Sequence, residues 1–373
     1  MKNSKKSNIL PNVLLPSSPL FPDAARFPGS ALFLDIETTG LSGSRNRLYL
    51  IGTASVQNGR LTIEQYFAES PKEEPALVAA FDKLIEPFDT IITFHGNHFD
   101  LPFLGKCRKR LGMDSPVSNN KHYVDLYNIA HSYRHLFGLE NYRLKTLESY
   151  FGIHRKDALD GKEMIQTYQA YVKQPQEHLL ALMLQHNEDD LAGMAQLLSI
   201  YAYERFFQGS FDVCETAVSS YRKLDGTKGE ELIVSLRLNI PLPAAVSCKN
   251  SRYYLHAENH CARLCIPLFT GTLKYFYPNY KDYYYFPKED AAIHKSVACY
   301  ADPKHREKAK AATCYSKKAG LFLPQYEEVI TPAFYTEYRA PVSYFEWKDA
   351  SLCQEALTRY CMHILHILKA GKE

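Results

Sequence analysis

The sequence predicts an α/β fold, a mixed five-stranded sheet flanked by helices, together with a smaller mixed α+β C-terminal domain. Three strand-like runs come first, and alternating strands and helices follow them, which is the pattern of a mixed sheet. After Gln208-Gly209-Ser210 the character changes to strand-like stretches rich in tyrosine. We therefore expect a flexible N-terminal arm over residues 1–28, a first domain over 29–207 and a second over 208–373.

The elements follow from local patterns. The expected strands of the first domain are residues 31–36, 47–57, 61–69, 89–94 and 122–124, and Asn58-Gly59 predicts a tight hairpin between the second and third. Near-helical spacing of apolar residues predicts helices over 73–86, 99–111, 144–151, 161–172, 177–207 and 351–369. Asp125 is expected to cap the helix that follows the strand 122–124. Residues 309–318 fit either a helix or a strand.

Composition excludes several classes of protein. The 373 residues carry a net charge of +3, and their nine cysteines form no CxxC pair, which fits reduced thiols better than a disulfide framework. Prolines at positions 11, 16 and 19 interrupt the apolar part of the N-terminus, which makes it a poor signal peptide. No apolar run approaches the roughly 18 residues that a membrane span needs. We expect a cytoplasmic protein without a membrane partner.

Two acids stand on the first strand, in the stretch FLDIETTGLSGS. Side chains alternate along a strand, so Asp35 and Glu37 point to the same face. Two such carboxylates raise each other's pKa unless a cation lies between them, and a divalent metal ion is the natural partner because hard cations take oxygen ligands. The alternative is an exposed edge where both acids meet water, although the neighbouring Leu32, Phe33 and Ile36 are apolar.

Further acids occur at suitable places. Asp100 follows the buried strand 89–94, and sites in α/β sheets form at the ends of strands, although it also fits an ordinary acid at a helix N-terminus. His186 and Asp190 are spaced i, i+4 on the long helix and therefore share one face, as many surface pairs also do. Together, Asp35, Glu37, Asp100 and Asp190 form a ligand set for two divalent ions, Mg²⁺ or Mn²⁺, which can activate water at a phosphodiester. His186 is placed to take the proton of that water.

Three motifs carry a family resemblance. Asp-x-Glu-Thr-Thr-Gly from Asp35, Asn-x-x-Asp-x-Pro-Phe-Leu from Asn97 and His-Asn-x-x-Asp from His186 resemble the motifs of the DEDD 3′–5′ exonucleases. These enzymes form the DnaQ-like branch of the ribonuclease H-like fold, and the chain is most similar to the YprB-like proteins of bacteria. The resemblance covers about residues 31–200 and rests also on Leu50-Ile51-Gly52 and Glu73-Glu74-Pro75-Ala76-Leu77. No family is recognised for residues 208–373.

The resemblance implies roles for individual residues. It makes Asp35, Glu37, Asp100 and Asp190 metal ligands and His186 the general base. The substrate-binding residues that it implies are Thr38, Gly40, Leu41, Asn97 and Phe99, with Leu41 on the terminal base and Asn97 beside the 3′ end. One departure is that His186 stands four residues before Asp190, whereas the histidine-type exonucleases have five. This spacing matches the YprB-like pattern.

Other clusters have competing interpretations. Asp125 is expected to be a cap rather than a ligand, and Glu148 a surface acid rather than part of a metal site. Seven aromatic residues between Phe269 and Phe286, interleaved with lysines, fit a nucleic-acid surface or a packed hairpin. The basic run 304–310 fits a phosphate-binding patch or a solvated helix face. A zinc site at His256, His260, Cys261 and Cys265 is a further, weaker hypothesis, because structural zinc sites usually show closer CxxC pairs.

The function expected from the sequence is a metal-dependent 3′–5′ exonuclease on single-stranded nucleic acid, with DNA and RNA both open as substrates. The alternatives are a nucleic-acid-binding module without activity and a structure-specific endonuclease on the same scaffold. The presence of all four acids and the histidine favours the enzyme.

Overall fold

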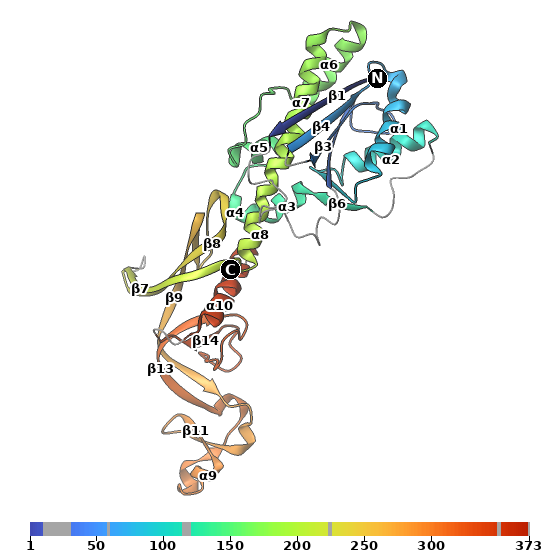
Figure 1. The fold of residues 1–373 in the computed structure, drawn as a ribbon. Coiled ribbons are helices and arrows are strands. Elements are labelled where there is room, and N and C mark those ends of the chain that lie inside the picture. Colours follow the sequence, from blue (N-terminus) through green and yellow to red (C-terminus); the bar gives the residue numbers. More distant parts are fainter. Residues whose placement is uncertain (10–30, 58–59, 114–120, 223–225, 349–351, 372–373) are drawn as a thin grey trace. The chain divides into compact units, whose positions relative to one another are not determined.

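The computed structural model describes residues 1–9, 31–57, 60–113, 121–222, 226–348 and 352–371. The chain divides into two compact units, the first made of residues 1–204 with 242–244 and the second of 205–241 with 245–373 (Figure 1). Among the helices in the described ranges, none combines the length and the apolar character needed to cross a bilayer.

The first unit is built on a six-stranded sheet with the strand order β1-β4-β3-β2-β5-β6. Its strands are β1 (Lys2–Ile9), β2 (Ala31–Thr38), β3 (Leu48–Gln57), β4 (Arg60–Phe67), β5 (Thr90–Thr93) and β6 (His122–Asp125). Strands β1 to β4 pair antiparallel, whereas β5 pairs parallel with both β2 and β6. The predicted mixed sheet is confirmed, and the parallel strands β2 and β5 end at the same edge.

The N-terminus corrects one prediction. Lys2–Ile9 forms the edge strand β1, so this part of the expected arm is ordered and the sheet has one strand more than predicted. An edge strand is held by backbone hydrogen bonds and tolerates lysines, which is why this polar run shows no apolar period in the sequence. One of its lysines, Lys6, forms an ion pair with Glu188. Residues 10–28 of the expected arm lie outside the described residues.

Helices pack on the sheet of the first unit. They are α1 (Glu74–Ile85), α2 (Asp100–Leu111), α3 (Leu126–Ser132), α4 (Arg134–Phe137), α5 (Leu144–Tyr150), α6 (Gly161–Lys173) and α7 (Glu177–Leu197). The short 3-10 helices η2 (Pro71–Glu73) and η3 (Leu198–Ile200) and the helix α8 (Tyr201–Phe207) complete this part of the chain. Apolar side chains of α1 and α2 share one core with β2, and those of α6 and α7 share another with β3 and β4.

Most predicted helices are present within two residues of their expected ends. Two predictions differ more, because the stretch 177–207 is divided at η3 into α7 and α8, and the closing helix expected from residue 351 begins at Gln354. The sequence predicts no bounds for the short helices α3 and α4, since each is too brief to show a clear period. Asp125 caps α3 as predicted, accepting a hydrogen bond from the backbone amide of Tyr127 at 3.1 Å.

The second unit contains two further sheets. A five-stranded sheet has the order β14-β13-β9-β8-β7, and a three-stranded sheet has the order β11-β10-β12. The strands are β7 (Phe211–Arg222), β8 (Lys228–Lys249), β9 (Tyr254–Phe276), β10 (Tyr283–Phe286), β11 (Ala291–His294), β12 (Glu307–Lys308), β13 (Tyr315–Gln325) and β14 (Ser343–Glu346). The helices are η4 (Tyr280–Asp282), α9 (Lys295–Ala298), η5 (Pro303–His305), η6 (Ala311–Thr313) and α10 (Gln354–Lys369).

The open interpretations of the second half are partly resolved. Tyr275 packs against the core cluster of β9 and β13, and Tyr277, Tyr283 and Tyr285 pack against a second small cluster, so these rings serve packing. The basic run 304–310 lies on η5 and β12 and not on the face of an α-helix. The four histidines and cysteines considered for zinc lie on the strand β9, where i, i+4 spacing does not form a chelate. Within the described ranges no group of three metal-binding side chains gathers there.

Candidate active site

The two carboxylates of β2 point to the sheet face that α7 covers. Side chains of β2 alternate, and its apolar residues pack toward α1 and α2 on the opposite face. Asp35 accepts a hydrogen bond from Asn187, and Glu37 faces His186 at 3.5 Å, and both partners belong to α7. The two acids therefore share one face, as the alternation predicts.

A buried amide fixes the orientation of Asp35. The Asn187 side chain donates from Nδ2 to Asp35 Oδ2 at 2.7 Å and accepts at Oδ1 from Gln65 Nε2 at 2.8 Å. Gln65 Nε2 also donates to the Leu184 carbonyl at 2.8 Å, which ties β4 to α7. Gly52, opposite Asp35 on β3, is needed here because a Cβ atom would collide with Asn187 Oδ1. The glycine of the Leu-Ile-Gly run thus allows α7 to pack closely against the sheet.

Asp100 joins the same site from the first turn of α2. Its side chain is buried and accepts from the backbone amide of Ile36 on β2 at 3.2 Å. Burial raises the pKa of Asp100 to about 7, and its negative charge in turn raises the pKa of Asp35. Asp100 is thus an acid of the first turn of a helix, as the alternative predicts, and it is also buried against β2.

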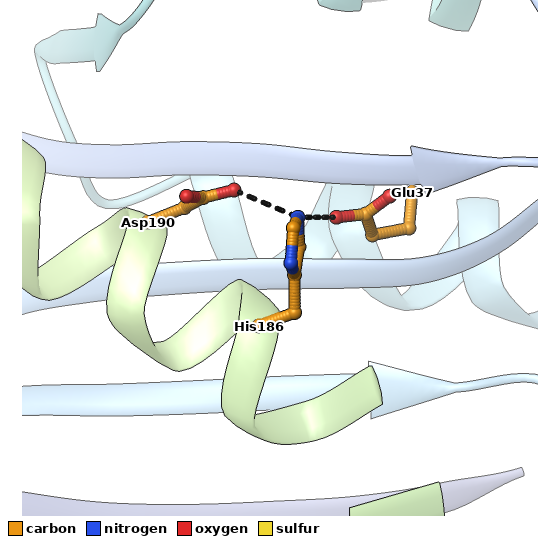
Figure 2. A group of neighbouring side chains, drawn as sticks. All are labelled: Glu37, His186 and Asp190. Atoms are coloured by element: carbon orange, nitrogen blue, oxygen red, sulfur yellow. Dashed lines mark ion pairs between the residues drawn. The ribbon is translucent and has the colours of Figure 1, made fainter. Parts of the chain in front are cut away.

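The helix α7 brings His186 and Asp190 to the acids of β2. The His186 Nε2 atom lies 3.5 Å from Glu37 Oε1 and 3.5 Å from Asp190 Oδ2, and Figure 2 shows the imidazole ring between the two carboxylates. The ligand atoms of these three residues all lie within 4.8 Å of one another. This tight group does not include Asp35 or Asp100. The His186 side chain is only 8% exposed.

The other ring nitrogen of His186 has a partner that the sequence did not suggest. Asp157, in the segment between α5 and α6, places Oδ2 at 2.8 Å from His186 Nδ1. Burial raises the pKa of Asp157. A hydrogen bond from the Leu159 amide, together with the neighbouring His186 and Lys145, has the opposite effect, and the pKa is lowered overall. The ionised carboxylate accepts only, so Nδ1 donates to it, and Nε2 is the ring nitrogen that faces Glu37 and Asp190.

Arg155 occupies one side of Asp190. Its Nη2 atom lies 2.6 Å from Asp190 Oδ1, and its Nη1 atom lies 2.8 Å from Glu148 Oε2. Burial lowers the pKa of Arg155, but the neighbouring Asp190 and Glu148 carboxylates raise it by more. The guanidinium is therefore charged. Arg155 leaves the second oxygen of Asp190 facing His186.

The expectation that Glu148 is a surface acid is wrong. Its side chain is 1% exposed, and it holds Arg155 through both carboxylate oxygens. Gly193 of α7 lies against it so closely that a Cβ atom there would collide with Glu148 Oε1. Glu148 was misjudged because its local pattern on the short helix α5 does not reveal the neighbouring α7.

The segment that carries Arg155 and Asp157 is anchored to α7. Asp189 Oδ2 accepts from the backbone amides of Lys156 at 2.8 Å and Asp157 at 2.7 Å. Glu188, the preceding residue, is buried beside Lys6 of β1. The two acids thus fix the surroundings of His186 and Asp190.

The site carries an excess of negative charge. Burial, followed by the charges of Asp190 and Glu37, raises the pKa of Asp35 well above its ordinary value. Burial, followed by the charges of Asp190 and Asp100, does the same for Glu37. In the described part of the chain, no lysine or arginine forms an ion pair with Asp35, Glu37 or Asp100. A donor set of oxygen atoms with uncompensated charge fits a divalent cation.

The first unit is similar in sequence to known proteins. The family model of the RNase H superfamily matches residues 32–202. An uncharacterized protein of Bacillus subtilis, YprB, is 30% identical over 175 residues, which are 46% of this chain and 41% of YprB. The PolC-type DNA polymerase III of Caldanaerobacter subterraneus is 25% identical over 178 residues, covering 41% of this chain and 12% of the polymerase.

Residues 32–202 are therefore similar in sequence to the RNase H superfamily. The matched region spans less than half of the length of either relative. Among solved structures, the family B DNA polymerase of Pyrobaculum calidifontis matches with a TM-score of 0.37 at 14% identity, over 70% of this chain and 36% of the polymerase. E. coli exonuclease I in complex with dT13 matches with a TM-score of 0.31 at 14% identity, over 56% of this chain and 55% of the exonuclease. Both scores are below 0.5, so neither match bears on activity.

The turn after β2 carries three of the residues expected to bind substrate. The Thr38 side chain is buried and donates from Oγ1 to the Gly40 carbonyl at 2.8 Å, so both residues shape the turn. Leu41, the next residue, is 87% exposed. An apolar side chain held this far into solvent by an ordered turn is free to contact a ligand.

The loop between β5 and α2 carries the other two expected residues. The Asn97 side chain is exposed, and its backbone amide donates to Asp125 Oδ2 at 3.2 Å. Phe99 is half-buried and packs its ring 5.8 Å from that of Phe103. Asn97 thus lies at the surface beside Asp100, whereas Phe99 belongs partly to the core.

Lowering the pH from about 8 to about 6 is expected to raise the thermal stability of the metal-free protein. The pKa of Asp100 is about 7 in the folded state, above its ordinary value of 3.8. Between these values the folded state binds a proton that the unfolded state does not, so the free energy of unfolding rises as the pH falls through about 7. Asp35 and Glu37, whose pKa values are also raised, act in the same direction.

The measurement is the unfolding midpoint in EDTA as a function of pH for the wild type and for Asp100→Asn. The asparagine variant can still accept from Ile36 but does not titrate, so its midpoint should rise less. An equal rise in both proteins would contradict the assignment of the shift to this site.

Proposed function

We propose that this chain is a metal-dependent 3′–5′ exonuclease that hydrolyses phosphodiester bonds of single-stranded nucleic acid. The observation that carries the proposal is the convergence of four carboxylates from β2, α2 and α7, with His186 among them, in a region similar in sequence to the RNase H superfamily. The similarity to a DNA polymerase also supports a nucleic-acid substrate.

Two divalent cations, Mg²⁺ or Mn²⁺, are the proposed cofactors. Asp35, Glu37, Asp100 and Asp190 would hold them, since these acids supply hard oxygen donors and, among the described residues, only Asp190 pairs with an arginine. When bound, such ions activate water and stabilise the leaving oxygen of a phosphodiester. The Nε2 atom of His186 is close enough to Glu37 and Asp190 to be an additional ligand, which would favour Mn²⁺ because imidazole suits transition metals better than Mg²⁺.

His186 is proposed as the base that takes a proton from the attacking water. Asp157 holds Nδ1–H, which leaves the Nε2 lone pair on the side of the acids. The four-residue spacing to Asp190 is compatible with this role, because i and i+4 lie on one face of a helix and the Asp157 contact sets the ring orientation. Arg155 positions Asp190 by holding one of its oxygens.

The end of the strand is proposed to meet Leu41 and Asn97. Leu41 offers an exposed apolar side chain to the terminal base, and Asn97 offers an exposed amide from the neighbouring loop. Thr38, Gly40 and Phe99 would act mainly by fixing the backbone of these two loops.

Incubation of the full chain with Mn²⁺ and single strands labelled at either end tests the proposal. Matched DNA and RNA strands should be shortened stepwise from the 3′ end, and EDTA should stop the reaction. Internal cuts would show a structure-specific endonuclease instead. Binding without cleavage of any strand, with Mn²⁺ or Mg²⁺, would show a nucleic-acid-binding module and refute the proposed activity.

A further inference from the structure

A continuous series of rings leads away from the loop that carries Asn97. The ring centroids are 5.1 Å apart for His98 and His95, 4.5 Å for His95 and Tyr127, 5.6 Å for Tyr127 and His131, and 5.6 Å for His131 and Tyr142. We call these five side chains the ring row. Both histidines of the loop are exposed, and the other three rings are half-buried. The row joins the loop to α3 and to the segment before α5.

One carboxylate fixes the ring row beside the acids of the candidate active site. Asp125 Oδ1 accepts from the backbone amides of His95 at 2.8 Å and Tyr127 at 3.1 Å, and its Oδ2 accepts from Asn97. The loop that Asp125 holds leads directly into Asp100 at the start of α2, where the Leu101 amide donates to the Gly96 carbonyl at 3.0 Å. The inner end of the row is therefore held near the site by hydrogen bonds.

His95 has a left-handed backbone conformation. Its φ is 63°, a left-handed value that is uncommon for residues other than glycine and that costs free energy. Among the described residues, no side-chain hydrogen bond or ion pair engages the His95 or His98 ring. The loop thus presents two exposed imidazoles in a strained conformation, and their ring partners among the described residues are each other and Tyr127.

We propose that the ring row is a binding site on which unpaired bases of a nucleic-acid strand stack while its end lies in the active site. Rings present flat apolar faces that any base can cover, and only a single strand has bases free to do so. Arg134 and Arg143 are exposed beside Tyr142 at the outer end of the row, where they can meet the phosphates of the same strand. The inference rests on the proposed function and specifies a single strand of several nucleotides as the substrate.

Affinity measured without cleavage tests this site. The full chain carrying Asp35→Asn is titrated with a fluorescent 12-nucleotide strand, the same strand with abasic sites, and a blunt duplex. Tyr127→Ala is expected to weaken binding of the intact strand by about 5- to 150-fold, the range that follows from losing one stacked base. Tyr127→Phe, which keeps the ring, should bind within about twofold of the parent. The abasic strand should bind weakly to the parent and lose nothing further in Tyr127→Ala.

Matched controls separate stacking from a loss of fold. His98→Ala removes an exposed ring at the inner end and should weaken binding in the same sense, whereas His178→Ala on α7 and Tyr221→Ala on β7 remove exposed rings elsewhere and should not. Equal loss for intact and abasic strands, or unchanged affinity in both Tyr127→Ala and His98→Ala, would overturn the inference. Absence of any strand binding would overturn it as well.

The outcome is independent of the proposed chemistry. Base-dependent binding by a wild type that cleaves nothing would refute the exonuclease and keep the stacking site. Cleavage from the 3′ end, together with equal binding of intact and abasic strands, would keep the exonuclease and refute the stacking site.

Discussion

Asp35→Asn is expected to reduce nucleotide release to the uncatalysed background and, at the same time, to make the metal-free protein more stable. The carboxylate is a proposed metal ligand, so its loss removes the cation site. In the absence of metal, however, burial and the charges of Asp190, Glu37 and Asp100 disfavour the charged form of Asp35. The asparagine keeps an oxygen that can accept from Asn187 and carries no charge. The substitution should therefore raise the melting temperature by about 2–4 °C for each kcal/mol that it adds to the free energy of unfolding.

Asp190→Asn is the informative comparison. It should also abolish turnover, but it should lower the stability of the metal-free protein by about 1.5–3 kcal/mol, because Arg155 loses a charged partner at 2.6 Å. Melting curves in EDTA, Mn²⁺ titration calorimetry and strand cleavage should be measured for both variants. Glu64→Gln, a carboxylate on β4 paired with Lys5, is the control outside the acid cluster and should keep both activity and metal binding. Wild-type activity in Asp35→Asn or Asp190→Asn would refute the site, and stability shifts of the same sign would refute the charge argument.

The parts of the site that lie on regular elements could be predicted from the sequence. Alternation along a strand places Asp35 and Glu37 on one face, and the helical repeat places His186 and Asp190 on one face. Both are local rules, and both hold in the structure.

The partners of these residues could not be predicted. Arg155 and Asp157 lie in a segment between α5 and α6 without any period, and they reach the site because Asp189 anchors the backbone there. Neither the contact of Glu148 with Arg155 nor that of Asn187 with Gln65 has a local signature. Arg155 lies in a segment without any period, and Asn187 and Gln65 are 122 residues apart. Gly193 is the sort of signal that would have helped, since a glycine in the middle of a helix indicates a close neighbour.

The fold shows the same limit. The sequence does not predict the strand β1, because this edge strand is rich in lysine and serine. It is stabilised by backbone hydrogen bonds to β4 and not by apolar side chains. In the second unit, the strands β8 and β9 are long and carry mixed polar and aromatic residues, so their pairing depends on partners far along the chain. Local patterns specify where an element lies but not what it meets.

His186→Ala is expected to slow strand cleavage by about 10²- to 10⁴-fold if the imidazole is the general base. Asp157→Asn should cause a smaller loss, because the ring keeps its place on α7 but loses the carboxylate that holds Nδ1–H and directs Nε2 toward Glu37 and Asp190. Single-turnover rates measured at saturating Mn²⁺ check both expectations. His178→Ala, an exposed histidine at the start of the same helix, is the matched control and should react at the wild-type rate.

Metal affinity decides between the two roles that the geometry allows for His186. A base acts on the water and leaves Mn²⁺ binding nearly unchanged, whereas a ligand takes part in the group formed with Glu37 and Asp190, whose atoms lie within 4.8 Å of one another. Loss of rate with Mn²⁺ affinity retained would therefore identify the base and account for the unusual four-residue spacing to Asp190. A loss of Mn²⁺ affinity about equal to that of Glu37→Gln would identify a ligand, and a wild-type rate in His186→Ala would exclude both roles.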